Sequence, residues 1–229
     1  MLSAQGFCIA SGGHVPVKDG FAVGLYSGYT NNHIYSSVGY RSFTKYENGH
    51  GYVVGISAGY SVTDWFAVYA EPSVIAKSYT LLRTDYAVGN EQNWRNTYLQ
   101  MPLVAQFSFG GKNILGFVNL GGYASGWINS RTWGKYQEST SYPADYGEEY
   151  FHYFKENVKF DKERDNRFDC GLLIGLGLKY NFADWGIFAE VRYYYSLSDM
   201  QKNYMYEQIP RYNDTYVFTT GAVYRIKSK

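Results

Sequence analysis

The stretch that decides the fold is FDCGLLIGLGLKYNFADWGIFAEVRYYYS, residues 168–196. It holds two runs of alternating residues separated by the turn 182–185. In the first run, one parity carries Phe168, Cys170, Leu172, Ile174, Leu176, Leu178 and Tyr180, and the other carries Asp169, Gly171, Gly175, Gly177 and Lys179. Because successive side chains of a strand point to opposite faces, the stretch predicts a β-hairpin with one continuous apolar face and one charged face.

The same period-2 pattern recurs along the chain and predicts eight strands, at 21–30, 51–62, 66–84, 97–109, 115–130, 167–181, 186–198 and 215–227. Three connections, 62–65, 110–113 and 182–185, are tight turns built from Gly, Asn and Asp. The connections between them, 31–50, 85–96, 131–166 and 199–214, are long and polar. Alternating short and long connections are typical of outer-membrane barrels. We therefore predict an all-β fold, a closed antiparallel eight-stranded up-and-down transmembrane β-barrel.

The composition agrees with a barrel and excludes several other classes. The 229 residues include 26 Tyr, 14 Phe, 5 Trp and 25 Gly, and the formal net charge is +1. The aromatic content excludes disorder, and the near-neutral net charge does not indicate the basic surface that nucleic-acid binding needs. A mean hydropathy of −0.36 does not exclude a membrane barrel, because alternate apolar residues average out against polar neighbours. Cys8 and Cys170 are too far apart in sequence for a disulfide scaffold and show no metal-ligand spacing.

The chain is expected to form one domain. Residues 21–229 are assigned to the outer-membrane barrel, and residues 1–20 to an N-terminal periplasmic segment. Within that segment, Leu2-Ser3-Ala4-Gln5 resembles the end of a secretory signal, although the positive and apolar regions of a signal peptide are missing. An ordinary disordered N-terminus is the alternative.

The charges indicate which face meets lipid. Ionisable residues share the polar parity of their strands, and Glu71 and Lys77, for example, fall on one face. An apolar exterior with a charged interior is the reverse of a soluble lipocalin-like barrel. The candidate lumen charge network is Glu71, Asp169, Lys179, Glu190, Arg192 and Arg225, with Lys179 and Glu190 diagonal neighbours across the hairpin. A paired structural network is favoured, and a proton or ion relay is the alternative.

Several motifs resemble those of the PorT-like outer-membrane β-barrel family, which are small eight-stranded barrels of the OmpA type. They are YLQMPL (98–103) with FSFG (107–110), FVNLGGY (117–123), FDCG (168–171) with GLG (175–177), FAEVRY (188–193) and GAVYRI (221–226). Gln100 replaces the glutamate usual in the first motif, and the chain extends past the usual aromatic end. The resemblance implies an outer-membrane location without catalytic residues. It also raises a role as an accessory of a secretion system, which one branch of the family serves.

The sequence shows no catalytic or cofactor motif. His14, His33, His50 and His152 all fall outside the predicted strands, and no Ser/His/Asp spacing is recognisable. His33 and His50 flank the first long loop and could meet at its base, but two His without a carboxylate fall short of a typical metal site. We therefore predict no enzyme activity, no cofactor and no metal.

The long connection 131–166 is the richest feature outside the strands. Its candidate surface-binding residues are Trp133, Tyr136, Tyr150, Phe154 and Phe160, interleaved with charges of both signs. Tyr150, Phe154 and Val158 have helical spacing, which allows a short amphipathic helix. Alternatively, the flanking strands extend beyond the membrane and their aromatic side chains pack against other loops.

These observations favour a membrane-embedded structural or interaction module that acts through its outer loops or periplasmic rim. The expected partners are outer-membrane lipid and an envelope protein or surface glycan, with no nucleic acid. The first alternative is a narrow porin-like channel for small solutes, which the filled lumen of eight strands disfavours. The second is soluble ligand binding in a lipocalin-like cup.

Overall fold

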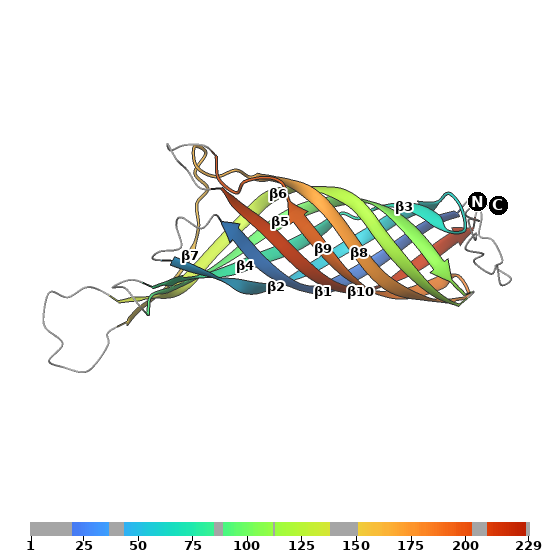
Figure 1. Cartoon of the computed structure of the whole chain (residues 1–229), viewed down its shortest axis with the longest axis horizontal. Coiled ribbons are helices and arrows are strands. Elements are labelled where there is room, and N and C mark those ends of the chain that lie inside the picture. Colours follow the sequence, from blue (N-terminus) through green and yellow to red (C-terminus); the bar gives the residue numbers. More distant parts are fainter. Residues whose placement is uncertain are drawn as a thin grey trace, which may run out of the picture.

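A computed structural model describes residues 20–36, 44–84, 89–111, 113–137, 151–202 and 210–227. The segment 1–19, which holds most of the expected periplasmic segment and Cys8, lies outside the described residues. The described residues form ten strands (Figure 1): β1 (Gly20–Ser36), β2 (Thr44–Ser61), β3 (Phe66–Ala70), β4 (Ser73–Arg83), β5 (Glu91–Gly110), β6 (Ile114–Gln137), β7 (Phe151–Asn157), β8 (Phe168–Phe182), β9 (Trp185–Ser196) and β10 (Arg211–Lys227). Within these ranges, no helix is long and apolar enough to cross a membrane.

The ten strands make eight barrel positions. β3 and β4 both pair with β2 and β5, and they are two halves of one strand interrupted at Glu71-Pro72. Proline has no N–H to donate to a sheet, which accounts for a break at this point. β7 and β8 both pair with β6 and share a second position. Because β1 pairs with β10 along its whole length, from Gly20↔Lys227 to Ser36↔Arg211, the antiparallel barrel closes as predicted.

The strands reach further on one side than the sequence suggested. β1 continues to Ser36 and β2 begins at Thr44, so most of the expected loop 31–50 lies in strands. β5 begins at Glu91, and β6 continues to Gln137, where it pairs with β7. The amphipathic helix considered for 150–158 is therefore wrong for the described part of that segment, and the alternative of extended strands is correct. In Figure 1 these extensions project from the end opposite the two termini.

The tight turns lie at the end that carries the termini. In the first, the N–H groups of Val62 and Thr63 both donate to the Phe66 carbonyl at 3.0 Å. In the turn 182–185, Phe182 pairs with Trp185, and Ala183 adopts a positive φ of 50°. These turns confirm two of the three predicted hairpins. In the third turn, 110–113, residue 112 lies outside the described residues. The N–H of Gly111 donates to the Ile114 carbonyl at 3.0 Å and so bridges the turn between β5 and β6.

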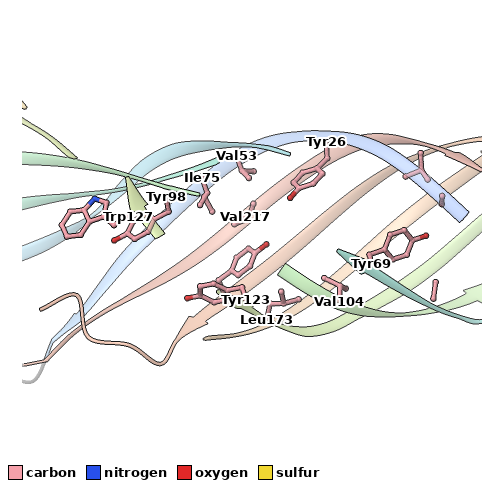
Figure 2. Close-up of a cluster of buried hydrophobic side chains, with 14 residues drawn as sticks. Tyr26, Val53, Tyr69, Ile75, Tyr98, Val104, Tyr123, Trp127, Leu173 and Val217 are labelled. Carbon is pink, nitrogen blue, oxygen red and sulfur yellow. The ribbon is translucent and has the colours of Figure 1, made fainter. Parts of the chain in front are cut away.

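The two faces follow the predicted parity. The apolar residues of β5, β8 and β9, such as Leu103, Ile174 (50% exposed) and Val191, point outward, and Asp169, Glu190 and Arg192 are buried inside. The interior is less polar than expected, because a cluster of buried apolar and aromatic side chains runs along it (Figure 2). Its members include Tyr26, Tyr98, Tyr123 and Tyr194, whose hydroxyl groups allow rings to pack beside charged groups.

Candidate functional sites in the lumen and at the outer end

A guanidinium group organises the middle of the lumen. Glu190, Arg192 and Tyr194 alternate along β9 and so share its interior face. The Arg192 guanidinium donates two hydrogen bonds of 2.8 Å to the two carboxylate oxygens of Glu190. It also donates to Glu71 at 2.5 Å and to the Tyr194 hydroxyl at 3.0 Å. Only 4% of the Arg192 side chain is exposed, so this is a buried bidentate ion pair with a second carboxylate attached.

Two amides extend this group toward Lys179. Asn119 Nδ2 donates to Glu190 at 2.9 Å, and Gln106 Nε2 donates to Asn119 Oδ1 at 3.1 Å. Lys179 Nζ then donates to Gln106 Oε1 at 3.4 Å. The strand register does make Lys179 and Glu190 diagonal neighbours, as predicted, since Glu190 lies opposite Gly177. The two charges are linked through amides, however, and they do not form a direct ion pair.

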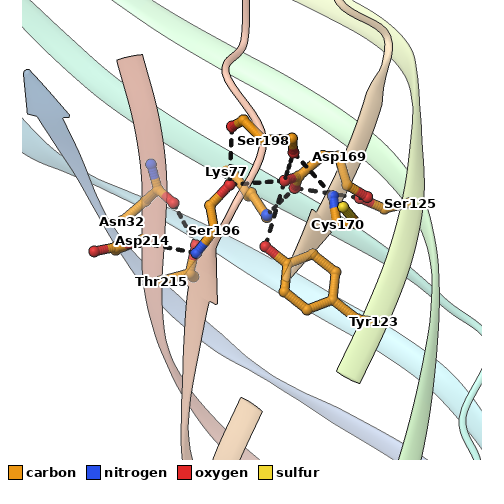
Figure 3. A network of polar contacts seen from close by, with 10 residues as sticks. All are labelled: Asn32, Lys77, Tyr123, Ser125, Asp169, Cys170, Ser196, Ser198, Asp214 and Thr215. Atoms are coloured by element: carbon orange, nitrogen blue, oxygen red, sulfur yellow. Dashed lines mark hydrogen bonds and ion pairs between the residues drawn. The ribbon is translucent and has the colours of Figure 1, made fainter. Parts of the chain in front are cut away.

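A second cluster lies nearer the outer end (Figure 3). Lys77 Nζ donates to Asp169 Oδ2 at 2.7 Å, and the Lys77 side chain is fully buried. The other Asp169 oxygen accepts hydrogen bonds from the hydroxyls of Ser196 and Ser198, both at 2.8 Å. Lys77 Nζ also lies 5.1 Å from the ring centroids of both Tyr98 and Tyr123. Parity identified Lys77 as a lumen residue, but nothing local in the sequence indicates that its partner is 92 positions away.

The six predicted lumen residues therefore do not form one network. Glu71, Glu190 and Arg192 are in direct contact, Lys179 joins them through amides, and Asp169 belongs to the separate cluster with Lys77. Arg225 is apart from both clusters, and its guanidinium donates to the carbonyl of Ala183 at 2.9 Å in the turn 182–185. The alternation along a strand predicts which face a side chain occupies. Whether two interior side chains touch also depends on their positions along the barrel axis.

Below the middle of the lumen the barrel is hollow. A cavity of about 340 Å³ lies among the three tight turns, and we call it the periplasmic vestibule. Tyr69, Gln106 and Lys179 line both the vestibule and a smaller cavity of about 20 Å³ that extends toward Glu71 and Glu190. The remainder of the lumen between the vestibule and the outer end holds the two clusters and the buried aromatic side chains.

The outer end carries a sheet extension built mainly from β6 and β7. We call it the outer arm, residues 131–137 and 151–157, joined by seven residue pairs from Arg131↔Asn157 to Gln137↔Phe151. Tyr136 stacks on His152 at 5.6 Å and contacts Phe154 at 6.1 Å between ring centroids. The Arg95 guanidinium lies over the Trp133 ring, with its Cζ 5.3 Å from the ring centroid. Tyr153 is the most exposed large hydrophobic side chain of the arm, at 80%.

Two of the predicted surface-binding residues do not lie on this arm. Phe160 packs inward, edge-to-face on Trp127 at 5.0 Å and beneath the Arg167 guanidinium at 4.6 Å, so it is a packing residue. Tyr150 lies outside the described residues. Trp133, Tyr136 and Phe154 remain as surface candidates. Tyr153, which was not selected from the sequence, joins them because the strand geometry turns it outward.

The histidines of the first hairpin lie in strands and have neutral partners. His33 Nδ1 is 2.8 Å from Asn48 Oδ1, and His50 hydrogen-bonds to the Tyr29 hydroxyl. The register pairs Asn31 with His50, so His33 and His50 are diagonal neighbours on adjacent strands, but each ring contacts a neutral side chain and not the other histidine. Among the described residues, no group of three or more His, Cys, Asp or Glu side chains could hold a metal ion.

The chain was compared with known families and structures. The family described as outer membrane protein beta-barrel domain matches residues 4–202. No curated protein gives a significant match. The outer membrane protein OprG from Pseudomonas aeruginosa is similar at 14% identity and a TM-score of 0.52, covering 94% of this chain and 99% of that chain. Neisserial surface protein A is 14% identical, with a TM-score of 0.48 and coverage of 90% and 97%. At this identity the likeness to OprG shows the fold alone.

Proposed function

The chain belongs to the family of outer membrane β-barrel proteins, and we propose that it works there as a non-enzymatic interaction module whose outer arm binds a partner. Its location is the outer membrane of a Gram-negative-type envelope. The exposed aromatic and charged surface of the outer arm, residues 131–137 and 151–157, is the observation that carries the proposal. Extended strands beyond the membrane add nothing to the lipid-facing band, so their aromatic residues require another role.

The arm has the composition of a binding surface. Tyr136 and Phe154 form an aromatic contact, and Lys135 Nζ lies 4.8 Å from the Phe151 ring centroid. Rigid aromatic side chains with nearby cations are the usual anchors of protein and glycan recognition. In addition, β7 pairs with β6 on one side, and among the described residues no strand pairs with its other edge. An open strand edge can accept an added strand from a partner.

The lumen supports an anchoring role over transport. Arg192 bridges Glu71 and Glu190, and Lys77 is bound to Asp169, so ion pairs and their amide and hydroxyl partners occupy the middle of the barrel. An eight-stranded barrel is just wide enough for side chains to fill. The narrow channel remains the second candidate function, because the periplasmic vestibule hollows one end of the lumen.

The sequence motifs refine the proposal. Those at 98–110 and 117–123 support membership of the PorT-like branch, part of which assists protein secretion. A component of a secretion apparatus is thus one class of partner, and a surface glycan is another. His33 pairs with Asn48 and His50 with Tyr29, so neither histidine is oriented by a carboxylate as the base of a Ser-His-Asp triad is.

Site-specific photo-crosslinking in intact cells tests the proposal. A photoreactive amino acid in place of Tyr153 probes the arm, one in place of Leu172 probes the lipid face, and one in place of Asp64 probes the periplasmic turns. We expect a discrete adduct from position 153 and none from position 172. That adduct should weaken with Phe154→Ser, which leaves the barrel strands intact. Adducts from position 64 alone would move the binding surface to the periplasmic rim, and an adduct at no position would refute the interaction role.

A further inference from the structure

The periplasmic vestibule has the features of a built binding site. Interior positions at this end carry small residues, which include Ala22, Ser61, Ala67, Ser108 and Gly186. The interior of an eight-stranded barrel is otherwise filled by side chains, so these small residues create the space. A Cβ on Gly186 would lie 2.8 Å from Asn181 Oδ1 and 3.6 Å from Lys179, so a larger residue at this position would displace the Asn181 side chain in the wall.

Lys179 and Arg225 line the vestibule, and among the described residues neither forms an ion pair with a carboxylate. Lys179 Nζ has a long hydrogen bond of 3.4 Å to the neutral Gln106 amide, and Arg225 donates to the carbonyl of Ala183. Glu190, which lines the adjoining small cavity, is already held by a bidentate contact with Nε and Nη2 of Arg192. Asp64 also lines the cavity, but it is exposed in the turn between β2 and β3. Two unneutralised cations in a concave, partly buried space favour a negatively charged ligand.

A buried polar atom independently indicates a missing partner. Thr63 is one of the residues that line the vestibule, and its Oγ1 is buried with no hydrogen-bond partner among the described residues. Ser57 Oγ is in the same condition in the adjoining small cavity. Buried hydroxyl groups are normally satisfied by protein, water or ligand. The amides of Asn113 and Asn181 add further donors and acceptors to the wall.

We propose that the vestibule binds a small organic anion that also carries hydroxyl groups, with Lys179 and Arg225 as the charge-recognising residues. A volume of about 340 Å³ lies at the lower end of the range of small-molecule sites and suits a ligand the size of a phosphorylated polyol. The three short turns surround the opening, so the ligand enters from the periplasm. This chemistry could be presented by a free solute or by the headgroup of an inner-leaflet phospholipid.

Calorimetric titration of the full chain in phosphatidylcholine nanodiscs, with glycerol 3-phosphate as the probe and glycerol as the neutral control, tests the proposal. We expect saturable binding of glycerol 3-phosphate and none of glycerol. Lys179→Met and Arg225→Met should each weaken binding about tenfold, the effect of losing one hydrogen bond to a charged group. Lys45→Met removes a cation at the opposite end and should leave the affinity unchanged.

Two further measurements keep the result interpretable. Ala22→Leu fills the vestibule and retains both cations, so it should abolish binding in a barrel whose circular dichroism matches wild type. Nanodiscs that contain phosphatidylglycerol distinguish a lipid headgroup from a free solute as the natural ligand. If the vestibule binds the headgroup, the lipid competes and the apparent affinity for glycerol 3-phosphate falls. If it binds only a free solute, that affinity is unchanged. Absence of binding by a folded wild-type barrel, or equal binding by Lys179→Met and Lys45→Met, would overturn the proposal and leave the cavity as a water-filled space.

Discussion

The buried pair of Lys77 and Asp169 makes a quantitative prediction. Asp169→Ala leaves a fully buried ammonium group without its carboxylate, and removing one partner of a buried ion pair typically costs about 3–5 kcal/mol. The rings of Tyr98 and Tyr123, each 5.1 Å from Lys77 Nζ, still face the ammonium group in the variant, so its charge is not left wholly uncompensated. We therefore expect the free energy of unfolding to fall by about 3 kcal/mol, at the lower end of the range.

Removing the other partner should be milder. In Lys77→Met, the Asp169 carboxylate keeps the hydroxyls of Ser196 and Ser198 at 2.8 Å and weaker contacts from Ser125 and Tyr123. Hydrogen bonds to a charged group contribute about 1.5–3 kcal/mol each, so the carboxylate stays largely compensated. We expect a loss of about 1–2 kcal/mol, because only the ion pair itself is removed.

The double variant supplies the decisive comparison. If the two residues are coupled as the structure shows, Lys77→Met combined with Asp169→Ala should cost less than the sum of the single changes by about 2 kcal/mol. The assay is equilibrium unfolding by urea in lipid vesicles, followed by the fluorescence of the five tryptophans. Additive losses would refute the assignment of a coupled pair, and a loss under about 1 kcal/mol for Asp169→Ala would show that water reaches Lys77.

Three other outcomes are expected. Ile174→Arg, on the lipid face near the middle of β8, should destabilise the barrel by about 2–4 kcal/mol in lipid vesicles, and equal stability would contradict the outward orientation. Gly175→Ala should lower the free energy of unfolding by about 1–3 kcal/mol, since the added Cβ would collide with the Glu190 carboxylate. An unchanged urea midpoint would show that the Glu190 side chain can move aside. In planar bilayers the wild-type protein should give no large, steady conductance steps, because Arg192 and its partners fill the lumen. Large, steady conductance steps would favour the channel function.

Periodicity predicted the membrane-embedded part of the fold well. A shift of one residue reverses the face of every side chain in a strand, so the alternation along β8 assigns Ile174 to lipid and Asp169 to the lumen, as observed. The outer parts of β1, β5 and β6 still have a buried face, which includes Asn32 and Ile34. Polar residues occur there at both parities, so the apolar alternation that identifies a strand in the sequence is lost. The break at Glu71-Pro72 was also missed, although Pro72 is a recognisable signal for it.

The candidate sites were less predictable because they depend on distant strands. Glu71, Asp169, Glu190 and Arg192 are buried in the lumen, and Lys179 and Arg225 are half-buried at the vestibule. The separation of Arg225 from Arg192 reflects height in the barrel, which follows from the stagger between strands. Phe160 shares the composition of its surface neighbours and still packs inward on Trp127. The vestibule arises from small residues on several strands, and no single stretch of sequence reveals it.

The seam between the first and last strands has a consequence for the making of this protein. β1 has no complete set of neighbours until β10 is present, since seventeen residue pairs join positions 20–36 to positions 211–227. Pairing between the far ends of a chain carries a large entropic cost and forms slowly. Until then, both seam strands present open edges prone to wrong association. The barrel can therefore close only once the last strand has been made, and both seam edges stay open during that delay.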